Sequence, residues 1–104
     1  MSEFIRVCSL EELPIGTIKA VTVGFDRVVL ARTESGVFAL ANECTHDGAP
    51  ISDGKLRGSS IMCTRHGARF DLTSGAVTAP PAIVPLDTFA VRIDGDDVFV
   101  QVKD

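Results

Sequence analysis

The sequence predicts an all-β protein with very little helix. Short segments rich in Val, Ile, Phe and Thr recur between turn signals, which is the pattern of an antiparallel sandwich or barrel. The chain does not alternate strands with long helices, as a parallel sheet would require. Its 104 residues, 45% of them hydrophobic, are enough for one domain with a core of its own.

The first predicted strand runs from Phe4 to Cys8. Ser9 follows it, and Glu12 stands three residues later, which is the capping-box pattern of a helix start. Pro14 limits this helix to a single turn. We expect the turn to be structural, without a part in function.

Further strands are predicted on both sides of a different middle part. Before it, strands are expected at residues 17–23, 27–33 and 37–41, with a hairpin turn at residues 34–36. After it, strands are expected at 88–93 and 98–102 around a polar turn. We expect the strands from the two ends of the chain to form one sheet system.

The middle of the chain is predicted to be dominated by loops. Five of the nine glycines fall between residues 48 and 75, together with Pro50: Gly48, Gly54, Gly58, Gly67 and Gly75. Glycine at this density lets the backbone turn tightly and approach a bound group closely. Without an internal repeat or a composition break, residues 1–104 are predicted to form a single domain with an insertion at about residues 42–82.

The charge balance excludes several classes of partner. Ten Lys and Arg against fourteen Asp and Glu give a formal charge of −4, which supplies no cationic field for nucleic acid or an anionic membrane. The longest uncharged stretch, residues 72–86, is interrupted by three prolines and is too short for a membrane span. No secretory signal precedes the first strand, so the expected location is the cytoplasm.

Four reactive residues lie in the insertion as two short motifs. Cys44 and His46 form C-x-H, and after sixteen intervening residues Cys63 and His66 form C-x-x-H. Each motif supplies one thiolate and one imidazole on a glycine-rich loop, so two converging loops can close around a metal centre. The odd count of three cysteines in a chain without a signal peptide argues against a disulfide scaffold.

Two other interpretations of these motifs stay open. The cysteines and histidines can be ordinary packed residues with no metal. Alternatively, two Cys and two His can form a tetrahedral zinc site, although a mixed pair on each loop is unlike the usual zinc finger.

The segments Cys44-Thr45-His46 and Cys63-Thr64-Arg65-His66-Gly67 resemble the signature of the Rieske [2Fe–2S] proteins. The resemblance covers more than the ligands, because residues 78–81 (Thr-Ala-Pro-Pro) look like the proline-containing loop that covers the cluster in that family. The predicted β framework around them also resembles the family's fold, so the resemblance spans most of the chain. It implies a Rieske-type antiparallel β-sandwich or barrel base with a small, loop-rich cluster-binding subdomain inserted.

The resemblance also implies the ligands of one [2Fe–2S] cluster per chain. Cys44 and Cys63 would hold one iron as thiolates, and His46 and His66 would hold the other through imidazole nitrogens. Neutral imidazoles in place of two thiolates raise the reduction potential above that of all-cysteine ferredoxins. Cys8 has no place in the pattern and is expected to pack in the first strand.

Departures from the high-potential members of the family indicate a low potential. Those members carry an extra cysteine pair where this chain has Ala49 and Arg65, and a serine and a tyrosine where it has Ala68 and Phe70. Because Ala68 and Phe70 have no hydroxyl to donate to cluster sulfur, we expect a midpoint near the low end of the Rieske range, on the order of −150 mV.

A soluble, low-potential Rieske protein resembles the ferredoxin component of ring-hydroxylating oxygenase systems. The implied function is to carry one electron from an NAD(P)H-dependent flavin reductase to a terminal oxygenase, each docking transiently near His46 and His66. The chain is not expected to be an enzyme, since no histidine remains for a catalytic mononuclear iron. We expect a monomer. The alternatives are a small Rieske subunit of an assimilatory nitrite reductase and, in another class, a zinc-stabilised protein-binding β module.

Overall fold

The computed structural model describes residues 3–45, 48–63, 67–80 and 82–102, and it confirms the predicted all-β class. Two single-turn 3-10 helices, η1 (Leu10–Glu12) and η2 (Ile51–Asp53), interrupt the strands. The strands are β1 (Phe4–Ser9), β2 (Ile18–Val23), β3 (Asp26–Thr33), β4 (Gly36–Ala41), β5 (Lys55–Arg57), β6 (Ser60–Met62), β7 (Arg69–Asp71), β8 (Val77–Ala79), β9 (Thr88–Phe89), β10 (Val91–Asp94) and β11 (Asp97–Gln101).

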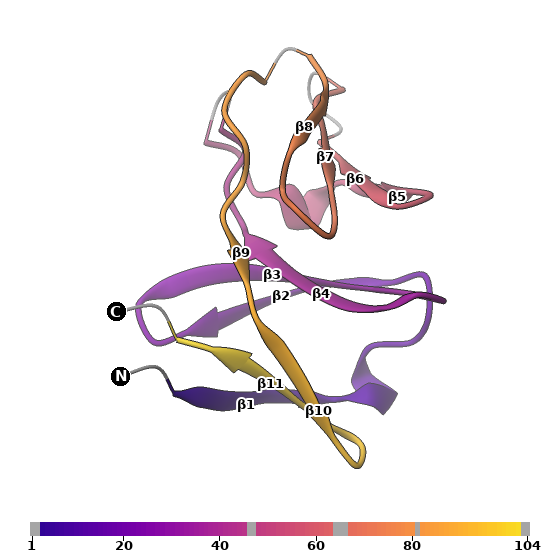
Figure 1. Cartoon of the computed structure of the whole chain (residues 1–104), viewed down its shortest axis with the longest axis vertical. Coiled ribbons are helices and arrows are strands. Elements are labelled where there is room, and N and C mark those ends of the chain that lie inside the picture. The colour runs from indigo at the N-terminus through magenta and orange to yellow at the C-terminus, as the bar shows by residue number, and fades with distance from the viewer. Residues whose placement is uncertain (1–2, 46–47, 64–66, 81, 103–104) are drawn as a thin grey trace.

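The strands form three antiparallel sheets stacked in layers (Figure 1). Sheet A has the order β1-β11-β10, sheet B the order β2-β3-β4-β9, and sheet C the order β5-β6-β7-β8. Sheet B is the middle layer, with sheet A below it and sheet C above it in the view of Figure 1. Sheet C belongs to the chain segment between β4 and β9, which also carries both cysteine motifs.

Strand β3 shows why the middle sheet separates two hydrophobic cores. Its residues Val28, Val29, Leu30 and Ala31 are all fully buried, because both faces of sheet B are covered. Side chains alternate along a strand, so Val28 and Leu30 join the lower core toward sheet A. Val29 and Ala31 join the upper core toward sheet C. A run of four apolar residues in the sequence is therefore a strand buried on both sides.

The predicted strand at residues 88–93 is two strands in different sheets. Phe89 of β9 pairs with Ala39 of β4 in sheet B, whereas β10 pairs with β11 in sheet A. The chain changes sheets at Ala90, whose carbonyl accepts a hydrogen bond of 2.9 Å from the Gln101 N–H. The single sheet system expected for the two ends is thus wrong in detail, since these strands divide between two sheets joined at this corner.

The middle part is more regular than the predicted loops. Residues 55–79 contain the whole of sheet C, although each of its strands is only three residues long. Each of the first three strands points one side chain into the upper core: Leu56, Ile61 and Phe70, in register across the sheet. With one inward residue per strand, the alternation of apolar and polar residues is too short to be recognised in the sequence.

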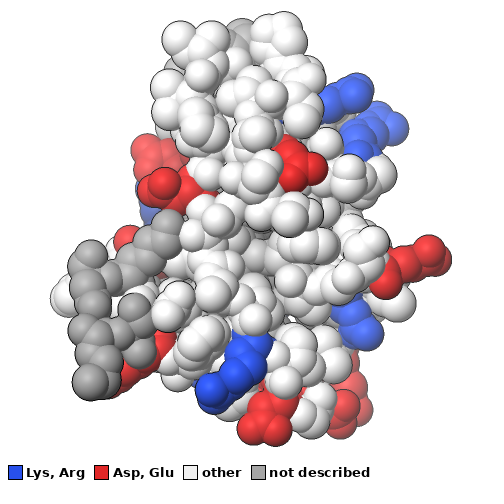
Figure 2. Space-filling model, in the orientation of Figure 1, with Lys and Arg blue, Asp and Glu red and all other residues white. Residues whose placement is uncertain are grey.

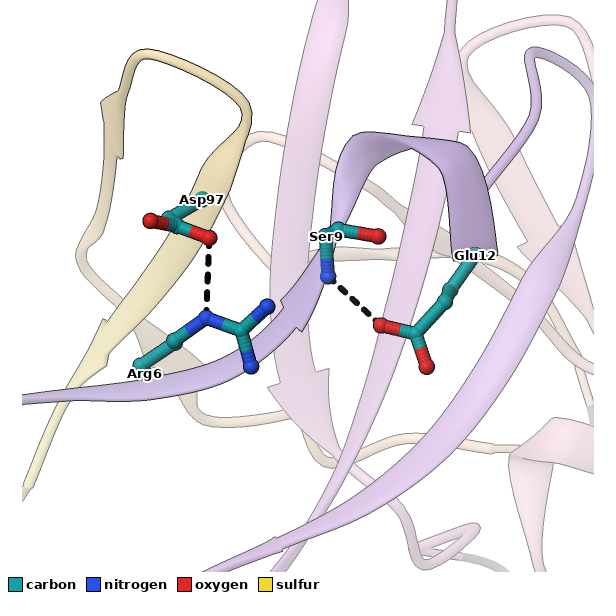
Figure 3. A network of polar contacts seen from close by, with 4 residues as sticks. All are labelled: Arg6, Ser9, Glu12 and Asp97. Carbon is teal, nitrogen blue, oxygen red and sulfur yellow. Dashed lines mark hydrogen bonds and ion pairs between the residues drawn. The ribbon is translucent and has the colours of Figure 1, made fainter.

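The predicted capping box is confirmed at the end of β1 (Figure 3). The Ser9 N–H donates a hydrogen bond of 2.7 Å to Glu12 Oε2, and this bond lowers the pKa of the Glu12 carboxyl. Beside it, the Arg6 Nε donates to Asp97 Oδ1 at 2.8 Å and joins β1 to β11. Both pairs lie at sheet A, on the far side of sheet B from sheet C. They therefore stabilise the base of the fold, which is formed by sheets A and B.

A buried polar contact fixes the chain where it leaves β4 toward the first cysteine motif. Asn42 is 7% exposed, and its side-chain amide both donates to Ser52 Oγ at 3.1 Å and accepts from the Ser52 N–H at 2.8 Å. Its own N–H donates to the Arg27 carbonyl at 2.9 Å. Asn42 therefore holds η2, β3 and the start of the cysteine segment together.

Within the described residues, no helix has the length and apolar character needed to cross a lipid bilayer.

Candidate metal centre

The two cysteines of the predicted ligand set lie in one apolar environment. Cys44 follows β4 and Cys63 follows β6 directly, and each is 2% exposed. Both side chains belong to the upper core between sheets B and C. The two predicted histidine ligands, His46 and His66, lie outside the described residues. Of the four predicted ligands, the structure therefore describes the two cysteines.

The two cysteine loops have the same backbone hydrogen bonds. In the first loop, the Cys44 N–H donates to the Ala49 carbonyl at 2.7 Å, and the Gly48 N–H donates to the Cys44 carbonyl at 2.8 Å. In the second, the corresponding bonds join Cys63 to the Ala68 carbonyl at 2.8 Å and the Gly67 N–H to the Cys63 carbonyl at 3.0 Å.

This repetition depends on a glycine at the same place in each loop. Gly48 and Gly67 have φ of +76° and +78°, a left-handed conformation that other residues adopt at a cost. The backbone therefore presents Cys44 and Cys63 in equivalent ways. The histidines break the equivalence, since His46 is two residues after its cysteine and His66 is three residues after.

The surroundings of the thiols are apolar. Five other buried apolar residues belong to the same core as the two cysteines: Ala68, Phe70, Leu72, Ala82 and Leu86. A soft, polarisable iron–sulfur group fits such a site, because two thiols at equivalent loop positions are the donors that it requires. A dry environment also limits the access of water to the bound metal.

Cys8 serves as an internal comparison. It is 1% exposed, but it lies in the lower core with Val98 and Leu13, on the other side of sheet B. Burial raises the pKa of the Cys8 thiol, which favours the uncharged form. Its expected role as a packing residue agrees with this position.

A third segment, residues 82–87, lies beside the first cysteine loop. Thr45 Oγ1 donates a hydrogen bond of 2.6 Å to the Val84 carbonyl, which joins the loop to this segment. A hollow of about 470 Å³ lies between them, with Glu43 and Asp87 at its acidic edge. This contact could not be predicted from the sequence, because a Thr inside a motif and a Val after two prolines carry no pairing signal.

The predicted covering loop at residues 78–81 begins in a strand. Thr78 and Ala79 belong to β8 and pair in sheet C, and Pro81 lies outside the described residues, so the covering role stays a prediction. The same stretch of chain continues through Val84, which contacts the first cysteine loop.

We expect Thr45→Val to loosen the first cysteine loop. The substitution keeps the shape of the side chain but removes the donor to the Val84 carbonyl, a loss of about 1 kcal/mol, or about fivefold in an opening equilibrium. A chelator should then remove bound iron about fivefold faster than from the parent protein. Thr45→Ser keeps the hydroxyl and should release iron at close to the parent rate; equal rates in Thr45→Val and the parent would show that the contact is unimportant.

At the end of the molecule that carries these loops, the face that Figure 2 shows is formed mostly by described residues without charge, and the segment 82–87 reaches this end in Figure 1. Ile83 and Val84 on it are 89% and 52% exposed. Exposed large apolar side chains next to a metal-binding loop are typical of a surface that meets another protein.

Comparisons with known proteins agree with this geometry. Residues 3–90 match the family described as Rieske [2Fe-2S] domain. The ferredoxin component of the naphthalene 1,2-dioxygenase system from Pseudomonas aeruginosa is 34% identical over 101 residues, covering 97% of each chain.

Two solved structures match nearly the whole chain. The ferredoxin of carbazole 1,9a-dioxygenase from Nocardioides aromaticivorans IC177 has a TM-score of 0.89 at 33% identity and covers 93% of this chain and 95% of its own. A structure of the complex of reduced oxygenase and oxidized ferredoxin in carbazole 1,9a-dioxygenase has a TM-score of 0.87 at 33% identity, covering 93% and 91%. With two buried thiols on equivalent loops and a match over most of its length, this chain belongs to the Rieske [2Fe–2S] domain family.

Proposed function

We propose that this protein is the ferredoxin component of a ring-hydroxylating oxygenase system. It carries one electron from an NAD(P)H-dependent flavin reductase to a terminal oxygenase, and it is not itself an enzyme. The observation that carries this proposal is the match to a dioxygenase ferredoxin component over 97% of both chains.

The proposed ligands are Cys44 and Cys63 for one iron and His46 and His66 for the other. The equivalent hydrogen bonding and burial of the two cysteines support the thiolate pair. The histidine pair is supported by the sequence motifs and the family. We further propose that residues 1–104 form a single Rieske domain whose cluster-binding insertion covers residues 42–82.

When bound, a [2Fe–2S] cluster supplies reversible one-electron chemistry. The chain's own residues exclude water from the site, hold the cysteine loops and provide a contact surface. The upper core excludes water from Cys44 and Cys63, and the repeated N–H···O=C bonds hold both loops in one conformation. Loops fixed in this way keep the structural rearrangement on electron transfer small. The exposed apolar side chains of Ile83 and Val84 offer a contact surface near the loops.

The partners follow from the same proposal. The reductase and the oxygenase dock in turn near His46 and His66, and the protein acts as a soluble, cytoplasmic monomer between them. A solved complex of a related ferredoxin with its oxygenase supports the oxygenase as one partner.

The reduction potential tests the assignment to oxygenase systems. Ala68 and Phe70 are fully buried in the upper core and offer no hydroxyl to cluster sulfur. We expect a midpoint on the order of −150 mV by protein-film voltammetry, and we expect Ala68→Ser and Phe70→Tyr each to raise it. A parent midpoint well above zero would remove the argument for a low-potential shuttle.

Reconstitution tests the function itself. The iron-loaded protein is expected to restore turnover when added to a reductase and a terminal oxygenase that lack their ferredoxin. Protein that purifies colourless with one zinc per chain would support the zinc module instead. Electron delivery to a sirohaem nitrite reductase, with none to any oxygenase, would support the nitrite reductase subunit.

A further inference from the structure

Sheet C has a cationic outer face. Lys55, Met62 and Arg69 pair in register across β5, β6 and β7, so their side chains lie on one side of the sheet. Arg57, two residues after Lys55, points to the same side. The other side holds the buried residues of the upper core, and all three cations are exposed.

The three cations lie close together. Adjacent strands are about 4.8 Å apart, so the Cα atoms of Lys55 and Arg69 are separated by about 10 Å, and those of Lys55 and Arg57 by about 7 Å. Among the residues that the structure describes, none of the three forms an ion pair with a carboxylate. Between Asp53 and Asp71 the sequence contains four of the ten basic residues and no acidic residue.

One carboxylate, Asp71, lies on the same side of the sheet at the edge of this patch. It pairs with Ser60, and its Oδ2 accepts hydrogen bonds from the Thr73 N–H and from the N–H and hydroxyl of Ser74. Its carboxylate is therefore directed to its own turn. The face keeps a local positive excess on a chain whose net charge is −4.

The cationic face is continuous with the second cysteine loop. Met62 immediately precedes Cys63, and Arg69 immediately follows Ala68, which ends the loop. Figure 2 shows basic side chains on the flank of the upper part where β5 lies in Figure 1, and acidic side chains on the opposite flank. The half-buried Met62 adds an adaptable apolar contact between the cations.

We propose that the outer face of sheet C, formed by Lys55, Arg57, Met62 and Arg69, is a docking surface for an acidic patch on an electron-transfer partner protein. The proposal rests on the proposed electron-carrier function and adds the side and the sign of charge through which a partner approaches. Attraction at this face holds the partner next to the Cys63 loop. Opposite charge accelerates such encounters, and salt reduces the acceleration.

A small anionic oxidant probes the face directly. Anaerobically reduced protein is mixed with hexacyanoferrate(III), which takes one electron from the protein and becomes hexacyanoferrate(II). The test variant carries Lys55→Gln, Arg57→Gln and Arg69→Gln. At about 10 mM salt, where charges act over about 30 Å, we expect its rate constant to be about tenfold lower than that of the parent. At about 1 M salt the two rate constants should converge.

A matched control separates the face from net charge. Arg6→Gln, Lys19→Gln and Arg92→Gln also remove three positive charges, but from strands of sheets A and B. This control should lower the rate constant less than threefold under the same conditions. Equal losses in the two triple variants would overturn the proposal, because net charge alone would then explain the effect.

Cross-linking tests protein docking without measuring electron flow. A carbodiimide joins a Lys amine to a carboxylate in contact with it, so the complex with a reductase or oxygenase that turns over with this protein should yield a peptide linking Lys55 to a partner Asp or Glu. Cross-links through Lys19 with none through Lys55 would contradict the proposal. If no oxygenase or reductase accepts the wild-type protein, the proposed function fails, and the hexacyanoferrate comparison still decides whether the face attracts anions.

Discussion

Protein carrying Cys63→Ala is expected to purify without colour and without stoichiometric iron. Cys63 is 2% exposed and begins the second cysteine loop, and the buried neighbours Ala68 and Phe70 in the same core carry no metal-binding group. Losing one of the two thiolates leaves an iron of the cluster without a protein ligand on that side. Iron content per chain and the visible absorption spectrum measure the outcome, and Cys44→Ala is expected to behave in the same way.

Cys8→Ala is the matched control for this result. Cys8 is as buried as Cys63 but lies in the lower core, across sheet B from the cysteine loops. Its replacement should lower the free energy of unfolding by about 1–2 kcal/mol through the small cavity that it leaves, with full iron content. Two irons per chain in Cys63→Ala, or loss of iron in Cys8→Ala, would refute the proposed thiolate pair.

Gly75→Ala is expected to destabilise the fold by more than about 3 kcal/mol. Gly75 has φ of +75°, and a Cβ built on it would lie 2.0 Å from the Leu86 carbonyl oxygen. That carbonyl is backbone, so it cannot rotate away as a side chain would. Gly75 also accepts the Leu86 N–H at 2.8 Å, which joins the β7–β8 turn to the segment beside the first cysteine loop. Thermal unfolding followed by circular dichroism measures the loss.

Gly58→Ala separates the clash from the backbone strain. Gly58 has φ of +60°, but a Cβ there would meet nothing within 4 Å. Its replacement should cost about 1–2 kcal/mol for the left-handed conformation alone. Similar unfolding temperatures for Gly58→Ala and Gly75→Ala would mean that the close approach of Leu86 to Gly75 has no energetic consequence.

The strands of the base could be predicted from the sequence because their patterns are long. The run from Val28 to Ala31 is apolar at every position, and polar turns bound each hairpin. The change of sheet at Ala90 could not be predicted, since nothing in a run of strand-forming residues marks which neighbour each half will pair with. Sheet C was missed because its strands are three residues long.

The candidate metal centre was predicted at the level of residue types and spacing. Two motifs, each pairing a cysteine with a histidine, carry a chemical signal that does not depend on the fold. The equivalent hydrogen bonding of the two loops and the contact of Thr45 with Val84 depend on tertiary structure, and a single sequence does not reveal them. The cationic face of sheet C could not be predicted either, because it depends on the register of strands that the sequence did not indicate.

In the proposed cluster, one iron is held by two cysteines and the other by two histidines. Electron–nuclear double resonance on the reduced protein, with heavy nitrogen introduced only into histidine, detects the histidine pair. We predict an anisotropic paramagnetic signal coupled to two inequivalent nitrogens, assigned to His46 and His66 because the chain has no other histidine. A fully iron-loaded, reduced protein whose signal shows no coupling to histidine nitrogen would rule out His46 and His66 as iron ligands.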